Sequence, residues 1–159
     1  MSTTMTIAKA LKRKNKLTGE INQLKQLIQQ ENRIKEGKTR NIDIEKTSEE
    51  LNLKIQELID IKSAISRANN SVVDKIYTLS EYKSQINFLK TLPTDQGEEK
   101  ETIGYSSVEK VNYTVVITKN QTIESIKKLQ EKIDKLQEEL DQFNFTTHIT
   151  YPEGEDLPF

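Results

Sequence analysis

The chain has 159 residues, a formal net charge of −1 and a hydrophobic fraction of 33%. That length suits one domain, and so thin an apolar fraction fits narrow helix seams better than a broad globular core. Because the sequence contains no cysteine, disulfides and thiolate metal sites are excluded. No aliphatic run approaches the ~20 residues of a membrane-spanning helix, and the start lacks the apolar segment of a signal peptide. We therefore expect a cytoplasmic protein.

Apolar residues recur every three or four positions in four segments, a spacing that predicts helices with one apolar stripe each. The first helix is expected over residues 6–33, with its stripe interrupted at Lys14. The last is expected over residues 122–143. Its stripe is the most regular in the chain and consists of Ile126, Leu129, Ile133, Leu136, Leu140 and Phe143.

Two further helices are expected between these. The second begins near Thr47 or Ser48, either of which could cap it, and ends at Asn69-Asn70-Ser71. The third begins at the capping-box pattern Thr78-Leu79-Ser80-Glu81 and stops before Pro93.

The segment before the last helix is different in character. Val111, Tyr113, Val115 and Ile117 alternate with polar residues, which predicts a short strand that pairs with residues 103–108. The expected fold class is therefore all-α. It is an antiparallel bundle of long, coiled-coil-like helices with a short β-hairpin or extended insertion before the last helix. We expect one helical domain over residues 1–150 and an irregular acidic tail over residues 151–159.

Charge is unevenly distributed along the chain. The first helix starts with a basic block of Lys9, Lys12, Arg13, Lys14 and Lys16, whereas the end of the chain is acidic. In an alternating bundle these two regions would meet and compensate each other. A nucleic-acid patch is the other interpretation of the basic block. Overall neutrality and the few nearby aromatic residues argue against it.

No motif indicates a reaction. The single histidine is His148, and one histidine cannot supply the two Glu-x-x-His pairs of a helical-bundle metal site. The sequence also lacks a phosphate-binding loop and a dinucleotide fingerprint. We therefore expect neither an enzyme nor a catalytic residue, and neither a metal site nor a cofactor.

Polar and aromatic side chains gather near two predicted helix ends and in the segment before the last helix. Arg67, Asn69 and Asn70 are expected to form one wall of a ligand pocket. The other wall would consist of Tyr105, Tyr113, Asn144 and Phe145. Guanidinium binds phosphate, amides pair with ring edges, and aromatic faces stack on bases. The alternative is that these residues are helix caps and a satisfied polar network.

Several of the same residues carry a family resemblance. Ile65-Ser66-Arg67-Ala68-Asn69, Thr78-Leu79-Ser80-Glu81, Lys110-Val111-Asn112-Tyr113 and Asn144-Phe145-Thr146-Thr147 resemble successive landmarks of the septicolysin-like family of small bacterial and phage helical proteins. The resemblance covers about residues 7–149. This chain departs from the family at Gln85 and Asn87, where the family tends to have Arg and Asp, and at Phe145, where it tends to have Trp. The family name implies a cytolysin.

These observations lead to one expected function and two alternatives. We expect a non-enzymatic protein that self-associates, with a dimer as its smallest unit, and sequesters a small anionic, nucleotide-like ligand at a helix-end pocket. The alternatives are a membrane-active, cytolysin-like pore former and a structural coiled-coil adaptor. Charged faces on all four helices argue against insertion into lipid, so a membrane is not an expected partner. A nucleic acid is not expected either, because the chain is nearly neutral overall.

Overall fold

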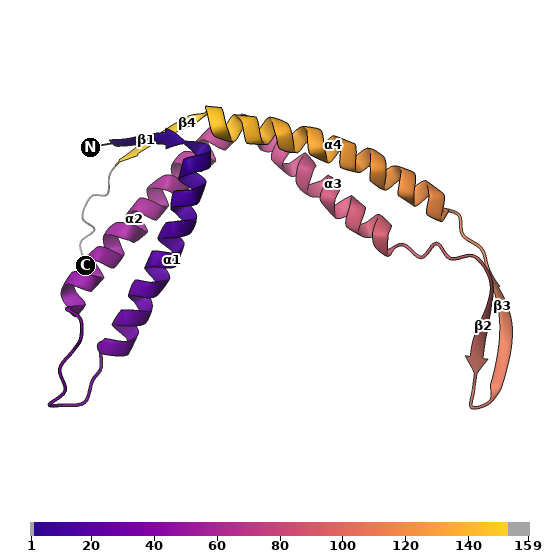
Figure 1. Cartoon of the computed structure of the whole chain (residues 1–159), viewed down its shortest axis with the longest axis horizontal. Coiled ribbons are helices and arrows are strands. Elements are labelled where there is room, and N and C mark those ends of the chain that lie inside the picture. The colour runs from indigo at the N-terminus through magenta and orange to yellow at the C-terminus, as the bar shows by residue number, and fades with distance from the viewer. Residues whose placement is uncertain (1, 153–159) are drawn as a thin grey trace. The chain divides into compact units, whose positions relative to one another are not determined.

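The computed structural model describes residues 2–152, of which 65% are helical and 16% are in strands. The elements are labelled in Figure 1 and follow the chain in this order: β1 (Ser2–Thr6), α1 (Ile7–Glu31), α2 (Ile44–Asn69), α3 (Val73–Thr91), β2 (Gly97–Ile103), β3 (Ser107–Tyr113), α4 (Lys119–Thr146) and β4 (His148–Pro152).

The chain divides into two compact units. Unit 1 comprises Met1–Val73 together with Asp141–Phe159, and unit 2 comprises Asp74–Leu140. The expectation of one helical domain over residues 1–150 stays a prediction.

The predicted all-α bundle is wrong. The fold is mixed, because the helices are accompanied by two antiparallel two-stranded sheets, β1–β4 and β2–β3. In the first sheet Thr4 lies opposite Thr150, and Met5 lies opposite Ile149. Local periodicity reports only on neighbours in sequence, so it could not indicate a pairing across 146 residues. The sheet also reaches Pro152, two residues into the segment expected to be an irregular tail. Residues 153–159 lie outside the described part of the chain.

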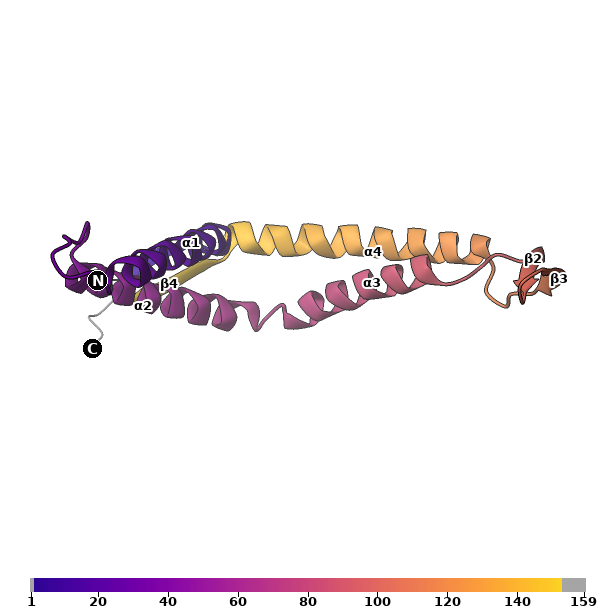
Figure 2. The same ribbon diagram turned by 90° about the horizontal axis from the view of Figure 1, so that it is seen from below.

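Unit 1 is built on the antiparallel pair of α1 and α2, which lie side by side in both views (Figures 1 and 2). The β1–β4 sheet packs against this pair, and its alternation turns Ile149 and Tyr151 inward while Thr150 stays exposed. A backbone hydrogen bond of 2.9 Å from the Ile7 N–H to the Thr147 carbonyl oxygen ties the start of α1 to the end of α4. The core consists of Ile7, Ala10, Leu17, Ile61, Ala64, Ile65, Ile149 and Tyr151.

The starts of α2, α3 and α4 all lie earlier than predicted, and the first two show why. α2 is capped by Asp43, whose side chain accepts a hydrogen bond of 3.1 Å from the Lys46 N–H, rather than by Thr47 or Ser48. α3 begins at Val73, so Thr78 lies inside the helix, where its hydroxyl donates to the Asp74 carbonyl oxygen at 2.7 Å. An upstream acidic residue in each first turn favours the earlier start electrostatically.

Unit 2 contains most of α3, the first part of α4 and the β2–β3 hairpin. The two helices run antiparallel, with an ion pair of 2.8 Å between Lys75 and Glu139 and the Lys132 ammonium 5.7 Å from the centre of the Tyr82 ring. The hairpin turns at Gly104, whose φ of 71° suits glycine. The predicted pairing of residues 103–108 with 111–117 is wrong, because the observed strands lie earlier in the chain.

Candidate functional site

The seven residues expected to form a ligand pocket divide between the two units. Arg67, Asn69, Asn70, Asn144 and Phe145 belong to unit 1, where Asn69 and Asn144 are half-buried and the other three are exposed. The two tyrosines belong to the hairpin of unit 2, and both are exposed.

Asn69 and Asn70 line a cavity of about 390 Å³ in unit 1, here called the helix-end cavity. It lies between α1 and the end of α2. Its lining consists of Lys14, Lys62, Ile65, Ser66, Asn69, Asn70 and Val73.

Lys14 reaches this cavity because of its place in the α1 seam. Ala10 and Leu17 flank it at helical spacing and are fully buried, so Lys14 occupies a position that faces α2. Its side chain is half-buried. Helical side chains lean toward the N-terminus of their helix, and in an antiparallel pair that direction leads from Lys14 toward the end of α2. The ammonium is therefore brought to the same cavity as the two asparagines.

The helix-end cavity is cationic. Its lining contains two lysines and no carboxylate, and within residues 2–152 no acidic group forms an ion pair with Lys14 or Lys62. The carboxyl end of α2 opposes this charge, but it carries only about half an elementary negative charge. The two full positive charges of the lysines outweigh it, so the cavity is suited to an anion.

The other predicted residues of unit 1 do not line this cavity. Arg67 and Asn69 are two positions apart on one helix, so their side chains point in nearly opposite directions. The backbone N–H of Asn70 donates to the Arg67 carbonyl oxygen at 3.4 Å, but in the described part of the chain no side-chain hydrogen bond or ion pair joins Arg67, Asn144 or Phe145 to the cavity residues.

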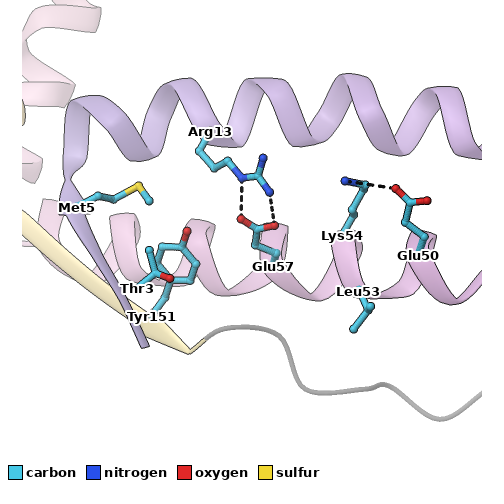
Figure 3. Close-up of a pocket in the computed structure, with 8 residues that line it drawn as sticks. All are labelled: Thr3, Met5, Arg13, Glu50, Leu53, Lys54, Glu57 and Tyr151. Atoms are coloured by element: carbon cyan, nitrogen blue, oxygen red, sulfur yellow. Dashed lines mark hydrogen bonds and ion pairs between the residues drawn. The ribbon is translucent and has the colours of Figure 1, made fainter. Parts of the chain in front are cut away.

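A larger cavity of about 530 Å³ lies elsewhere in unit 1 and is here called the inter-helix groove (Figure 3). The β1–β4 sheet forms one side of it, and α1 and α2 form the other. Its lining consists of Thr3, Met5, Arg13, Glu50, Leu53, Lys54, Glu57 and Tyr151.

Arg13 and Glu57 form a two-point hydrogen bond at this groove. The Nε and Nη2 atoms of Arg13 donate to the two carboxylate oxygens of Glu57 at 2.7 and 2.6 Å. This contact is the main reason that the pKa of Arg13 is raised above its ordinary value. The guanidinium is thus fully committed to one carboxylate, with Glu20 more distant at 4.0 Å.

Lys54 contacts two carboxylates at different distances. Its ammonium donates to Glu20 at 2.9 Å and lies 3.6 Å from Glu50. The hydrogen bond with Glu20 raises the pKa of Lys54 and lowers the pKa of Glu20. The side chain of Glu50 is 57% exposed, against 24% for Glu20, so the contact with Glu50 is the weaker of the two.

The ligand pocket predicted from the sequence includes no residue of the inter-helix groove, and Arg13 was singled out only as part of the basic block. A usable signal was present, since only 4 of the 24 basic residues are arginine and Arg13 is the one arginine in the basic block. On α2, Glu50, Lys54 and Glu57 follow at spacings of four and three, which places them on one face. Charges that flank an apolar seam in this way commonly pair across two helices.

No group of histidine, cysteine or acidic side chains within residues 2–152 is arranged to hold a metal ion. In the same part of the chain, no helix combines the length and the apolar character that crossing a membrane requires.

Comparison of the chain with protein-family models, curated proteins and solved structures finds no match. The resemblance to the septicolysin-like family therefore stays a prediction, and the geometry of the two cavities carries the functional argument.

Proposed function

We propose that this protein is a non-enzymatic binding protein that sequesters a small anionic, nucleotide-like ligand in the helix-end cavity. One observation supports this most directly. Lys14 occupies a seam position, is half-buried, has no acidic partner in the described chain, and faces the same cavity as Asn69 and Asn70. A partly desolvated cation without a counter-charge is costly to fold, and a bound anion offsets that cost.

The remaining lining fits the rest of such a ligand. The amides of Asn69 and Asn70 can donate to and accept from the edge of a nucleobase. Ile65 and Val73 offer apolar contact to a ring or sugar, and the hydroxyl of Ser66 offers one more polar partner. The cavity volume of about 390 Å³ lies within the range of small-molecule sites.

A structural role for Lys14 competes with this proposal. A single lysine in an apolar seam can fix the register or the subunit number of packed helices at some cost in stability. In that case Lys14→Gln changes stability or association and leaves ligand binding unaffected. The two roles therefore have different experimental signatures.

Titration calorimetry of the purified chain with AMP, adenosine and inorganic phosphate tests the proposal. We expect AMP to bind more tightly than either adenosine or phosphate alone, because it engages both the lysines and the amides. Lys14→Gln should weaken AMP binding roughly tenfold or more, because one charge-assisted hydrogen bond is lost. Lys25→Gln, an exposed lysine on the same helix, is the matched control. Binding unchanged by Lys14→Gln, or no binding of AMP, would contradict the proposal.

Arg67 tests how far the site extends. Because Arg67 is exposed and lies outside the cavity lining, Arg67→Ala should leave AMP affinity within about twofold, the size expected of a residue without a direct contact. A complete loss of binding would instead support the wider pocket, with Arg67 as its anion-binding residue.

The proposal includes self-association through the β2–β3 hairpin of unit 2. In the described chain no helix of that unit packs extensively on the hairpin, and a lone two-stranded hairpin is marginally stable in water. Ile103 and Val108 are 49% and 62% exposed. Lys100 lies opposite Lys110, which forms an ion pair of 3.0 Å with Glu98, and Glu101 lies opposite Glu109 on the other face, so that second face places like charges together.

A second copy of the chain would cover the exposed apolar residues and bring positive charge to the face of Glu101 and Glu109. We therefore propose a homodimer as the smallest unit, located in the cytoplasm, as befits a chain without cysteine. Sedimentation velocity at micromolar concentration tests this. Val108→Lys should shift the protein toward monomer, whereas Thr102→Ser at the opposite position should not. A wild-type monomer at that concentration would contradict it.

A further inference from the structure

We propose that the inter-helix groove is a second binding site, which takes a small amphipathic monoanion, meaning an aromatic or branched aliphatic group that carries one carboxylate. This site is separate from the helix-end cavity. The two share no lining residue.

The apolar part of such a ligand has a wall to contact. Met5 and Tyr151 come from the β1–β4 sheet, and Leu53 comes from α2. Leu53 is 38% exposed although it lines a cavity, so an apolar ligand would remove much of its surface from water. Figure 3 shows the Tyr151 ring beside Thr3 and next to the Arg13–Glu57 pair. Tyr151 is only 3% exposed, so Met5 and Leu53 offer the accessible apolar surface, close to the charged residues.

The anionic part has one available partner. Arg13 is engaged at both ends of its fork by Glu57, so a ligand would have to break two short hydrogen bonds to reach it. Lys54 is easier to recruit, since its contact with Glu50 is 3.6 Å long and the Glu50 side chain is mostly exposed. A ligand carboxylate can replace Glu50 beside Lys54 while the tighter bond with Glu20 stays in place. Glu50 then turns to solvent.

The charge balance of the lining selects a monoanion. Arg13 and Lys54 face Glu50 and Glu57 within the lining, and Glu20 adds a third carboxylate beside both cations. A single ligand carboxylate that takes the place of Glu50 leaves this charge balance unchanged. A dianion such as a phosphate monoester would bring a second negative charge close to Glu57, which is unfavourable. The two cavities therefore take different classes of ligand.

Methionine methyl NMR gives a direct readout of the groove. The chain has two methionines, Met1 and Met5, and Met5 lines the groove. With carbon-13 labelled methionine methyl groups in the full chain, titration with phenylacetate should shift one signal, that of Met5, to saturation. Phenylacetamide, which has the same ring without the charge, should bind roughly tenfold more weakly. No saturable shift at millimolar phenylacetate, or equal binding of the amide, would overturn the proposal.

Two variants with opposite expected effects make the test specific. Lys54→Gln removes the anchor and should weaken phenylacetate binding, whereas Glu50→Gln removes the carboxylate that competes for the anchor and should strengthen it. Glu49→Gln, a neighbouring exposed glutamate outside the groove, is the matched control. If Lys54→Gln fails to fold, as circular dichroism would show, Glu50→Gln carries the test alone. Weaker binding by Glu50→Gln would overturn the proposal.

A failure here is distinguishable from a failure of the proposed function. Lys14→Gln alters the helix-end cavity and should leave the phenylacetate titration unchanged, because Lys14 does not line the groove.

Discussion

Arg13 and Glu57, 44 residues apart in sequence, are joined by two hydrogen bonds of 2.7 and 2.6 Å from one guanidinium to both oxygens of one carboxylate. A planar fork that meets both oxygens fixes the distance and the rotation of the two side chains together. The contact therefore sets the register of α1 against α2, and with it the position of Lys54 in the groove and of Lys14 in the cavity.

Lysine should not replace arginine at this position. Arg13→Lys keeps the charge but loses the two-point geometry, and we expect a loss of roughly 1–2 kcal/mol in the free energy of unfolding, reduced from a fully buried value by partial exposure. Urea denaturation at neutral pH measures it. Arg33→Lys, an exposed arginine on no cavity, is the control and should change stability by less than about 0.5 kcal/mol. Equal effects of the two substitutions would show that the fork adds nothing beyond its charge.

Acid should weaken unit 1 through Glu20. Lys54 lowers the pKa of Glu20 below its ordinary value of 4.5, so the contribution of Glu20 to stability is complete above pH 4.5 and is lost as the pH falls through the lowered value. The pKa of Lys54 is raised above 10.5, so its contribution is complete below pH 10.5 and is lost above it. We expect a plateau between these limits in unfolding midpoints measured across pH.

Glu20→Gln should lower the unfolding midpoint on the plateau and make its decline at acidic pH, here called the acid limb, shallower. Part of the acid limb should remain, because Asn41 lowers the pKa of Glu31 and Lys75 lowers the pKa of Glu139. An acid limb of unchanged slope in Glu20→Gln would show that Glu20 is not coupled to folding.

The sequence predicted the helices better than their ends. Seams such as the one from Ile126 to Phe143 repeat over several turns, and this redundancy makes a long helix easy to recognise. A helix start depends on one capping hydrogen bond to a free backbone N–H, and the side chains of several residues near residue 44 could accept it. Asp43 caps α2 because its carboxylate accepts from the Lys46 N–H, a choice that composition alone does not distinguish from Thr47 or Ser48.

The candidate site was predicted only in part for a related reason. Lys14 was recognisable as an interruption of a seam, and Asn69 and Asn70 as polar residues at a helix end, and the structure places all three at one cavity. The inter-helix groove depends on β1 and β4, whose pairing across the length of the chain leaves no local pattern. A site between elements that are distant in sequence requires the fold to be known first.

The observed cap of α2 leads to a stability prediction with an internal control. Asp43→Ala removes the acceptor for the Lys46 N–H and a negative charge beside a helix N-terminus, and should cost about 1 kcal/mol. Ser48→Ala, at one of the two caps expected from sequence, lies inside the helix and should cost less than about 0.5 kcal/mol. If the helix began at Ser48, thermal or urea unfolding would show a larger loss of stability for Ser48→Ala than for Asp43→Ala.

The sheet that joins the two ends of the described chain should be essential to unit 1. Ile149 is 5% exposed and packs in the core with Ile7 and Tyr151, so Ile149→Ala removes buried methyl groups and leaves a cavity. We expect a loss of about 2–4 kcal/mol in the free energy of unfolding, the usual range for such a truncation. Thr150→Val, one position along on the exposed face, keeps a β-branched side chain but loses the exposed hydrogen bond of 2.9 Å between its hydroxyl and that of Thr4, so it should cost less than about 1 kcal/mol. The comparison separates burial from strand propensity, since both positions lie in β4. If Ile149→Ala is as mild as Thr150→Val, the sheet does not contribute to the core of unit 1, and the groove that it encloses loses one of its walls.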